Sequence, residues 1–217
     1  MTQKSADPND LRNNPIPLPP DRSAMDLPML VGGHPAIDFV NGGERLLNAH
    51  SFIDFCLKEG LIDQGEAIHY RPHTKGMIEP PPGLANHQKA LRELLHAWVD
   101  GRRPQAVEQT KLYHFFHEAM TRSEFVNTAT GYAWRPIEEP FTGHHLPVYR
   151  LAHAALELLK DLTHGRLRRC AGEDCGWLFL DQSKAGRRRW CSMSDCGNAA
   201  KQRKFRARAA HTEGKSE

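Results

Sequence analysis

Four of the five cysteines lie in the last third of the chain, in two close pairs with the spacing Cys-x4-Cys-x15-Cys-x4-Cys. Thiolates are favoured zinc ligands, and two short pairs separated by roughly 15–20 residues are typical of a four-thiolate site. Four thiolates complete a tetrahedral coordination sphere and leave no position for a substrate. The spacing therefore predicts one structural Zn²⁺ ion, bound by Cys170, Cys175, Cys191 and Cys196.

The spacing is also compatible with two other roles for these thiols, as ligands of an iron–sulfur cluster or as redox-active groups. A disulfide framework is disfavoured because we expect a cytoplasmic protein, and cytoplasmic thiols are kept reduced. That location is expected because no run approaches the roughly 18 apolar residues of a membrane helix, and no secretion signal begins the chain. The fifth cysteine, Cys56, is interpreted as a small apolar core residue.

Most of the positive charge lies in the same segment as the cysteine pairs. Residues 166–211 hold 12 Lys/Arg against 4 Asp/Glu, whereas residues 1–165 hold 16 against 20. Since few acidic side chains are available to neutralise this segment, we expect a polyanionic partner, and phosphate contacts by Lys and Arg carry much of the affinity for nucleic acid. The candidate nucleic-acid contacts are Arg187, Arg188, Arg189, Asn198, Lys201, Arg203, Lys204, Arg206 and Arg208.

A β-hairpin is predicted between the two cysteine pairs, because it would bring the pairs together. Its strands are Trp177–Leu180 and Arg188–Cys191, with a turn at 184–186. The sequence after the last cysteine pair contains no proline and no internal glycine, so a basic helix is expected there, beginning near Cys196. Phe205 is predicted to pack inward from this helix.

Residues 27–165 are predicted to form a helix-rich domain, so the fold class is α+β. A disordered leader rich in Pro, Asn and Asp precedes it at 1–26, and the cysteine segment at 166–211 and a tail at 212–217 follow it. Apolar residues at helical spacing predict helices at 52–59, 87–101, 106–120 and 146–164, the first capped by Ser51 and the last by Gly165.

Two apolar runs near the start of this domain, Met29–Val31 and Ile37–Val40, are interpreted as short strand-like or turn-bounded segments, since glycine pairs bracket the second run. A second hairpin is expected around 126–134, with its turn near Thr130–Gly131.

Three motifs follow one another in the cysteine segment: Cys-x4-Cys-Gly-Trp-Leu-Phe-Leu-Asp, Arg-Arg-Trp-Cys-Ser-Met and Cys-Gly-Asn. In these motifs the segment resembles the CGNR zinc finger, a bacterial family described as stress-induced transcription regulators. In that family an N-terminal α/β domain called ABATE precedes the finger, and Gly33–Gly42 is similar to a motif near its start. The resemblance implies DNA binding and transcriptional control.

The chain departs from the family pattern at two positions. Ala199 replaces the arginine of the Cys-Gly-Asn-Arg signature, so any contact of that arginine is missing or passes to a neighbour such as Lys201. In the N-terminal motif, Asn41-Gly42 replaces Asn-Thr. We interpret Asp38 and Asn41 of this motif as residues that cap turns, and the alternative is a pocket for a small effector.

The expected function is transcriptional regulation through DNA bound by the zinc module, with the N-terminal domain serving for effector sensing or homodimerisation. An RNA-binding or protein-interaction module is the alternative. We expect no enzymatic activity. The spacing of His114, His117, His144 and His145 matches no metalloprotease motif, and the sequence contains no recognisable nucleophile–base motif.

Overall fold

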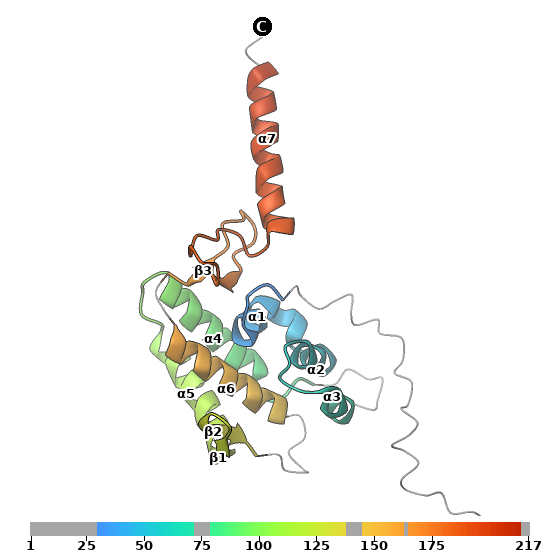
Figure 1. Cartoon of the computed structure of the whole chain (residues 1–217), viewed down its shortest axis with the longest axis vertical. Helices are drawn as coiled ribbons and strands as arrows, with labels where there is room; N and C mark the ends of the chain where they lie inside the picture. The colour runs from blue at the N-terminus through green and yellow to red at the C-terminus, as the bar shows by residue number, and fades with distance from the viewer. Residues whose placement is uncertain (1–29, 72–78, 138–144, 163–164, 214–217) are drawn as a thin grey trace, which may run out of the picture.

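The computed structural model describes residues 30–71, 79–137, 145–162 and 165–213, with side chains described as far as Arg208. The predicted leader at 1–26 lies outside these residues, as does most of the predicted tail. A helical body carries a smaller cysteine module, residues 165–213, and one long helix of that module projects away from the body (Figure 1).

Helices build most of the body and pack around one apolar core. Helices α4, α5 and α6 lie side by side, and α1 packs against α4 and α6. Phenylalanine rings of α1 and α2 meet at the centre of this core. The elements in chain order are α1 Pro35–Gly42, the 3₁₀ turn η3 Gly43–Leu46, α2 Ala49–Lys58, α3 Gln64–Tyr70, α4 Leu84–Val99, α5 Ala106–Thr121, β1 Ser123–Thr128, β2 Gly131–Pro136 and α6 His145–Asp161.

Helix α1 corrects the strand-like interpretation of Ile37–Val40. The side chain of His34 accepts the Ala36 N–H at 3.2 Å and caps the helix, and Pro35 occupies its first turn. The run Ile37–Val40 is buried on every side. Because even Asp38 within this run is buried, no solvent-exposed polar face reveals a period, and the sequence pattern alone does not separate a short buried helix from a strand.

The amphipathic helices were predicted correctly, with small shifts at their ends. The helices predicted at 87–101 and 106–120 are α4 and α5, and the second hairpin is β1 paired antiparallel with β2. Helix α2 begins earlier than predicted because Asn48, rather than Ser51, provides the cap; its side chain accepts the Ser51 N–H at 2.9 Å. Helix α6 ends at Asp161, four residues before its predicted cap, Gly165.

The cysteine module contains two very short strands, β3 Leu167–Arg169 and β4 Leu178–Leu180, which pair antiparallel with Leu167 opposite Leu180. The predicted pairing of Trp177–Leu180 with Arg188–Cys191 is therefore wrong. The second segment runs instead along the first cysteine pair, where the Ala171 N–H donates to the Arg189 carbonyl at 3.0 Å.

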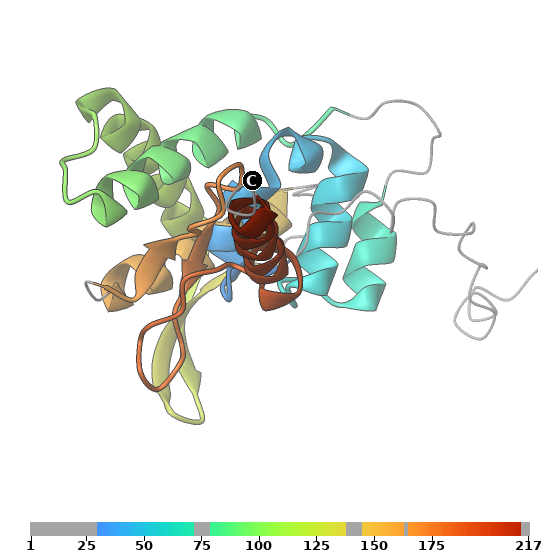
Figure 2. The same cartoon turned by 90° about the horizontal axis from the view of Figure 1, so that it is seen from above.

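The turn η4, Met193–Gly197, leads into α7, Asn198–Glu213, which stands clear of the body in Figure 1 and is seen nearly along its axis in Figure 2. The helix begins next to Cys196, as predicted, but Phe205 does not pack inward: it is 74% exposed. Apolar side chains form no stripe on α7, so nothing in its sequence turns one face toward the body.

Backbone and side-chain hydrogen bonds fasten the cysteine module to the body. The Asn41 amide exchanges two bonds with Leu178: its Nδ2 donates to the Leu178 carbonyl at 2.8 Å, and its Oδ1 accepts the Leu178 N–H at 2.9 Å. The Leu180 N–H donates to the Gly32 carbonyl at 2.7 Å. Leu167 and Leu178 are buried in the same core as the helices of the body. The module and the body therefore share a hydrophobic core.

Replacing Asn41 should loosen this attachment. In Asn41→Ala the N–H and C=O of Leu178 lose their partners in a buried position, which should lower the free energy of unfolding by about 2–4 kcal/mol. Urea titration of the zinc-loaded protein, followed by circular dichroism, measures the change. The exposed Gln109→Ala serves as control and should change stability by less than about 0.5 kcal/mol. Equal stability of the two variants would contradict the role of Asn41.

Candidate metal centre and basic helix

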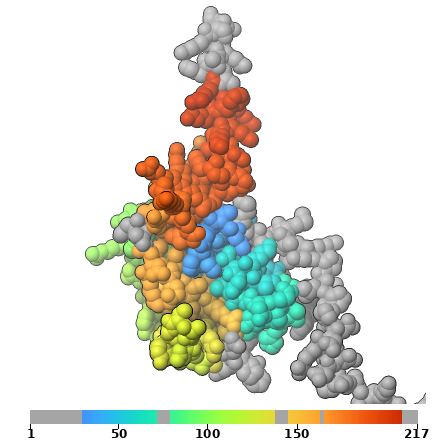
Figure 3. Space-filling model, viewed as in Figure 1, coloured from blue at the N-terminus to red at the C-terminus, as the bar shows by residue number. Residues whose placement is uncertain are grey.

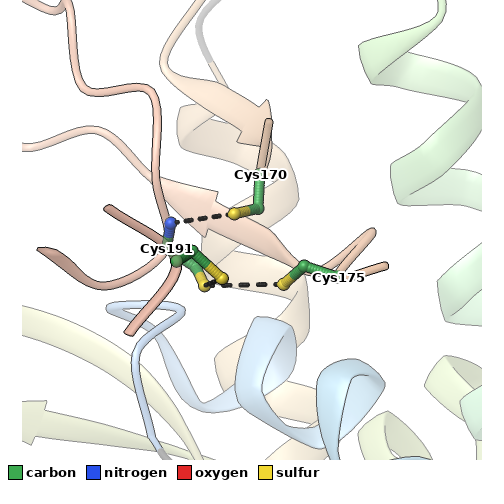
Figure 4. A group of neighbouring side chains, drawn as sticks. Cys170, Cys175 and Cys191 are labelled. Carbon is green, nitrogen blue, oxygen red and sulfur yellow. Dashed lines mark hydrogen bonds between the residues drawn. The ribbon is translucent and has the colours of Figure 1, made fainter. Parts of the chain in front are cut away.

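The four predicted ligands converge on one point of the module. Their Sγ atoms all lie within 4.8 Å of one another, with 3.6 Å between Cys175 and Cys191 and 3.7 Å between Cys191 and Cys196. A Zn–S bond of about 2.3 Å in a tetrahedral site implies S–S edges of about 3.8 Å. Figure 4 shows Cys170, Cys175 and Cys191 with their sulfur atoms turned toward one another. The thiol cluster therefore has the size that one tetrahedral zinc ion requires.

Backbone N–H groups prepare Cys170 for the thiolate form. Its Sγ accepts the N–H of Cys191 at 3.3 Å and of Gly172 at 3.4 Å. Burial alone would raise the pKa of the Cys170 thiol, but these donors hold that pKa below its ordinary value. A Cβ atom at Gly172 would approach the Cys196 Sγ to 3.2 Å, so glycine lets the backbone pass close to the sulfur atoms.

The thiols of Cys191 and Cys196 need a metal to ionise. Burial raises the pKa of Cys191 strongly and that of Cys196 to about 11, so both would hold their protons at neutral pH in the absence of a cation. Zinc replaces such protons and binds the thiolates. The donor set of four sulfurs fits one structural zinc ion, held by Cys170, Cys175, Cys191 and Cys196.

Asp181 organises the loop between β4 and the second cysteine pair. Its carboxylate is buried and accepts the Ser183 N–H at 3.0 Å and the Arg188 N–H at 2.8 Å. Asp181 was not among the residues predicted from the sequence, although Asp followed two positions later by Ser is a common turn pattern. By bonding to both ends of this loop, Asp181 fixes the position of residues 187–189 relative to β4.

The three arginines of this loop do not share one environment. Arg187 and Arg189 are exposed. The Arg188 guanidinium instead lies over the Phe179 ring, 4.6 Å from its centroid, and donates to the carbonyls of Trp190 and Cys191. Arg188 therefore helps hold the second cysteine pair in place, whereas the exposed Arg189 lies over the Trp190 ring, 5.2 Å from its centroid.

Helix α7 exposes its cations. All side chains from Lys201 to Arg208 are solvent-exposed. Arg203 lies 3.5 Å from the Glu173 carboxylate. Within the part of the chain that the structure describes, Lys201, Lys204 and Arg206 have no acidic partner. The space-filling view shows this helix as a narrow projection above the body (Figure 3).

One face of α7 combines charge with an aromatic ring. Helical spacing places Asn198, Lys201, Lys204, Phe205 and Arg208 on this face, while Arg203 and Arg206 lie on another. The side chain of Asn198 donates to the Ser194 carbonyl at 3.1 Å, at the start of the helix.

Asp38 and Asn41, the residues of the expected effector pocket, are buried and hydrogen-bonded to backbone. The Asp38 carboxylate accepts the Gly32 N–H at 2.8 Å, and Asn41 binds Leu178. Burial raises the pKa of Asp38, against the effect of N–H groups of residues 31–34 that lower it. The Asp38 contact agrees with the predicted turn cap, whereas Asn41 does not cap a turn: its amide pairs with Leu178 of β4. The effector pocket at this motif stays a prediction.

The histidine pair His114 and His117 lies on the exposed face of α5. Within the described residues, the four cysteines are the one group of His, Cys, Asp or Glu side chains placed to hold a metal. His144 lies outside the described residues, and His145 begins α6.

Comparison with known families agrees with this geometry. Residues 166–209 match the CGNR zinc finger family, and this stretch contains all four ligands and the first part of α7. No curated protein matches the chain. No helix among the described residues is long and apolar enough to span a membrane.

The metal content follows directly from the thiol cluster. We expect native mass spectrometry of the purified protein to give one zinc per chain, and Cys191→Ser to lose the metal, because three thiolates leave the coordination sphere open. Cys56→Ala is the matched control: Cys56 is buried in the body, away from the cluster, and its replacement should leave the zinc in place. Visible absorption from bound iron, or full zinc occupancy in Cys191→Ser, would contradict the site.

Proposed function

We propose that the protein binds DNA through its CGNR zinc finger and regulates transcription. The observation that carries the proposal is α7, which projects from the body with exposed cations along its length. A helix that is polar on every face has no apolar stripe to bury against its own protein. A binding partner that complements α7 must present negative charge to more than one face of the helix.

The shape of α7 favours DNA over duplex RNA. Its 16 residues span about 24 Å, and the major groove of B-DNA admits a helix with phosphates along both walls. The deep, narrow major groove of duplex RNA does not admit side chains. In the proposed complex Lys204 and Arg206, on different faces, contact phosphates of opposite walls. Phe205 and Asn198 are then placed to meet base edges.

Zinc would fix the direction of this helix. Cys196 is the last ligand and lies in the turn η4, two residues before Asn198, where α7 begins. The exposed Arg187 and Arg189 lie in the loop before the second cysteine pair, near the zinc site. Their side chains would add phosphate contacts beside the groove. We assign the N-terminal body to dimerisation or effector response rather than to catalysis, and we place the protein in the cytoplasm.

Binding to genomic DNA fragments across a salt series, with sequencing of the fragments retained at physiological salt, tests the proposal. A regulator should enrich a discrete sequence motif. A steep salt dependence without enrichment would leave phosphate contacts alone and contradict the regulatory role. Tighter binding of structured RNA in salt-matched competition, or no binding to either nucleic acid, would contradict DNA binding and favour RNA or an acidic protein as partner.

Charge removal on α7 should change the salt dependence in a defined way. Each phosphate contact contributes about 0.9 to the slope of log K against log salt, so Lys204→Gln/Arg206→Gln should lower the slope by about 1.8. The control, Lys58→Gln/Lys160→Gln, removes the same charge from exposed positions of α2 and α6 and should leave the slope nearly unchanged. Fluorescence anisotropy with labelled duplex DNA measures both. An equal decrease in both variants would show that net charge, rather than α7, drives binding.

A further inference from the structure

The charged side chains of α7 leave an uncharged strip between them. At about 3.6 residues per turn, Gln202 and Phe205 are neighbours on the helix surface, and Asn198 lies one turn before Gln202. These three residues, Asn198, Gln202 and Phe205, form the uncharged strip of α7. All three side chains are exposed, that of Phe205 by 74%. The strip therefore faces solvent along the first half of the helix.

Cations border the uncharged strip on both sides. Lys201, Lys204 and Arg208 follow one of its edges, and Arg206 lies beyond the other edge. A helix that lies in a groove brings its two flanks to the phosphates and the strip between them to the base edges. The distribution of charge on α7 matches this geometry, because charged side chains bind phosphates while amide and apolar groups can read bases.

The ion pair of α7 indicates which side of the helix faces the cysteine module. Arg203 lies nearly opposite Phe205 on the helix surface, and 3.5 Å separates it from the carboxylate of Glu173, between the first two zinc ligands. A carboxylate on that side repels phosphates. The Phe205 side of α7 is therefore the one that can enter a groove, while the Arg203 side stays toward the module.

Gln202 carries the free amide of the strip. The Asn198 amide donates to the Ser194 carbonyl at 3.1 Å, which ties it to the start of the helix. The Gln202 amide has no hydrogen-bond partner within the described part of the chain. A primary amide places a donor beside an acceptor, and this arrangement pairs bidentately with N7 and N6 of adenine in the major groove.

We propose that α7 reads two neighbouring A·T base pairs, with Gln202 bound to an adenine and Phe205 in contact with the methyl group of a thymine. The major groove offers an apolar group in this methyl, which an aromatic ring can contact. Residues roughly three or four apart on a groove-bound helix contact successive base pairs, as in zinc finger helices. The assignment rests on the proposed DNA binding and adds which bases are read and by which residues.

Selection from a random duplex library at physiological salt, with the zinc-loaded full chain, tests the role of Gln202. We expect the unmodified protein to enrich a motif that contains the A·T pairs. In Gln202→Arg the preferred base should change from A to G at one position, because arginine pairs bidentately with guanine. Exchanging A for G at that position should weaken binding of the unmodified protein roughly fivefold or more.

Gln109→Arg is the matched control for the added charge. Gln109 is exposed on α5, so this variant gains the same cation away from α7 and should select the same motif as the unmodified protein.

Deoxyuridine tests the Phe205 contact, because it removes the methyl group of thymine and leaves base pairing unchanged. Its use at the neighbouring thymine of the selected site should weaken binding of the unmodified protein about threefold. In Phe205→Ala the same exchange should have almost no effect, since the ring is gone. Phe205 is exposed, so its replacement should leave the fold intact. Fluorescence anisotropy measures the four affinities.

The outcomes separate this inference from the proposed function. If the unmodified protein enriches no motif, both are overturned. A motif without A·T pairs, or one that keeps its bases in Gln202→Arg, would overturn the reading by α7 and leave DNA regulation standing. An equal loss on deoxyuridine in the unmodified protein and in Phe205→Ala would overturn the thymine contact.

Discussion

Strand β4 has hydrogen-bond partners on both edges, and the placement of the zinc module on the body depends on this. One edge pairs with β3, and the other meets the Asn41 side chain and the Gly32 carbonyl. Three residues alone are too few for a stable strand. Here the strand is held because α1 presents Asn41 where a further strand would lie. Since Cys175 lies just before β4 and Asp181 just after it, fixing this strand also fixes one ligand and the loop that leads to the next pair.

The zinc ion and the body stabilise the module together. Its own buried cluster is small, with Phe179, Cys170 and Cys191 at its centre. A cluster of this size supplies little hydrophobic stabilisation, and structural zinc contributes on the order of 10–16 kcal/mol of apparent binding free energy. Leu167 and Leu178 add burial in the core of the body. The metal therefore orders the end of the module from which α7 departs, while the body orders the strands.

Local patterns predicted the parts that depend on local physics. The spacing of the thiols identified the four ligands, and the 3.6-residue period identified α4, α5 and α6. The hydrophobic pattern was misleading for α1, because a run in which every side chain is buried shows no alternation of apolar and exposed polar residues. The partner of β4 was also wrong, since β propensity does not encode which strand pairs with which.

The freedom of α7 has an evolutionary consequence. Helix α7 contacts the turn η4, and Arg203 pairs with Glu173, while the exposed side chains of Lys201, Lys204, Phe205 and Arg206 contribute little to the rest of the described fold. Substitutions along this stretch are then nearly neutral for stability, unlike changes at Asn41 or at the ligands. Selection can alter what the helix binds while the scaffold stays intact, and related chains should diverge fastest where they meet their partners.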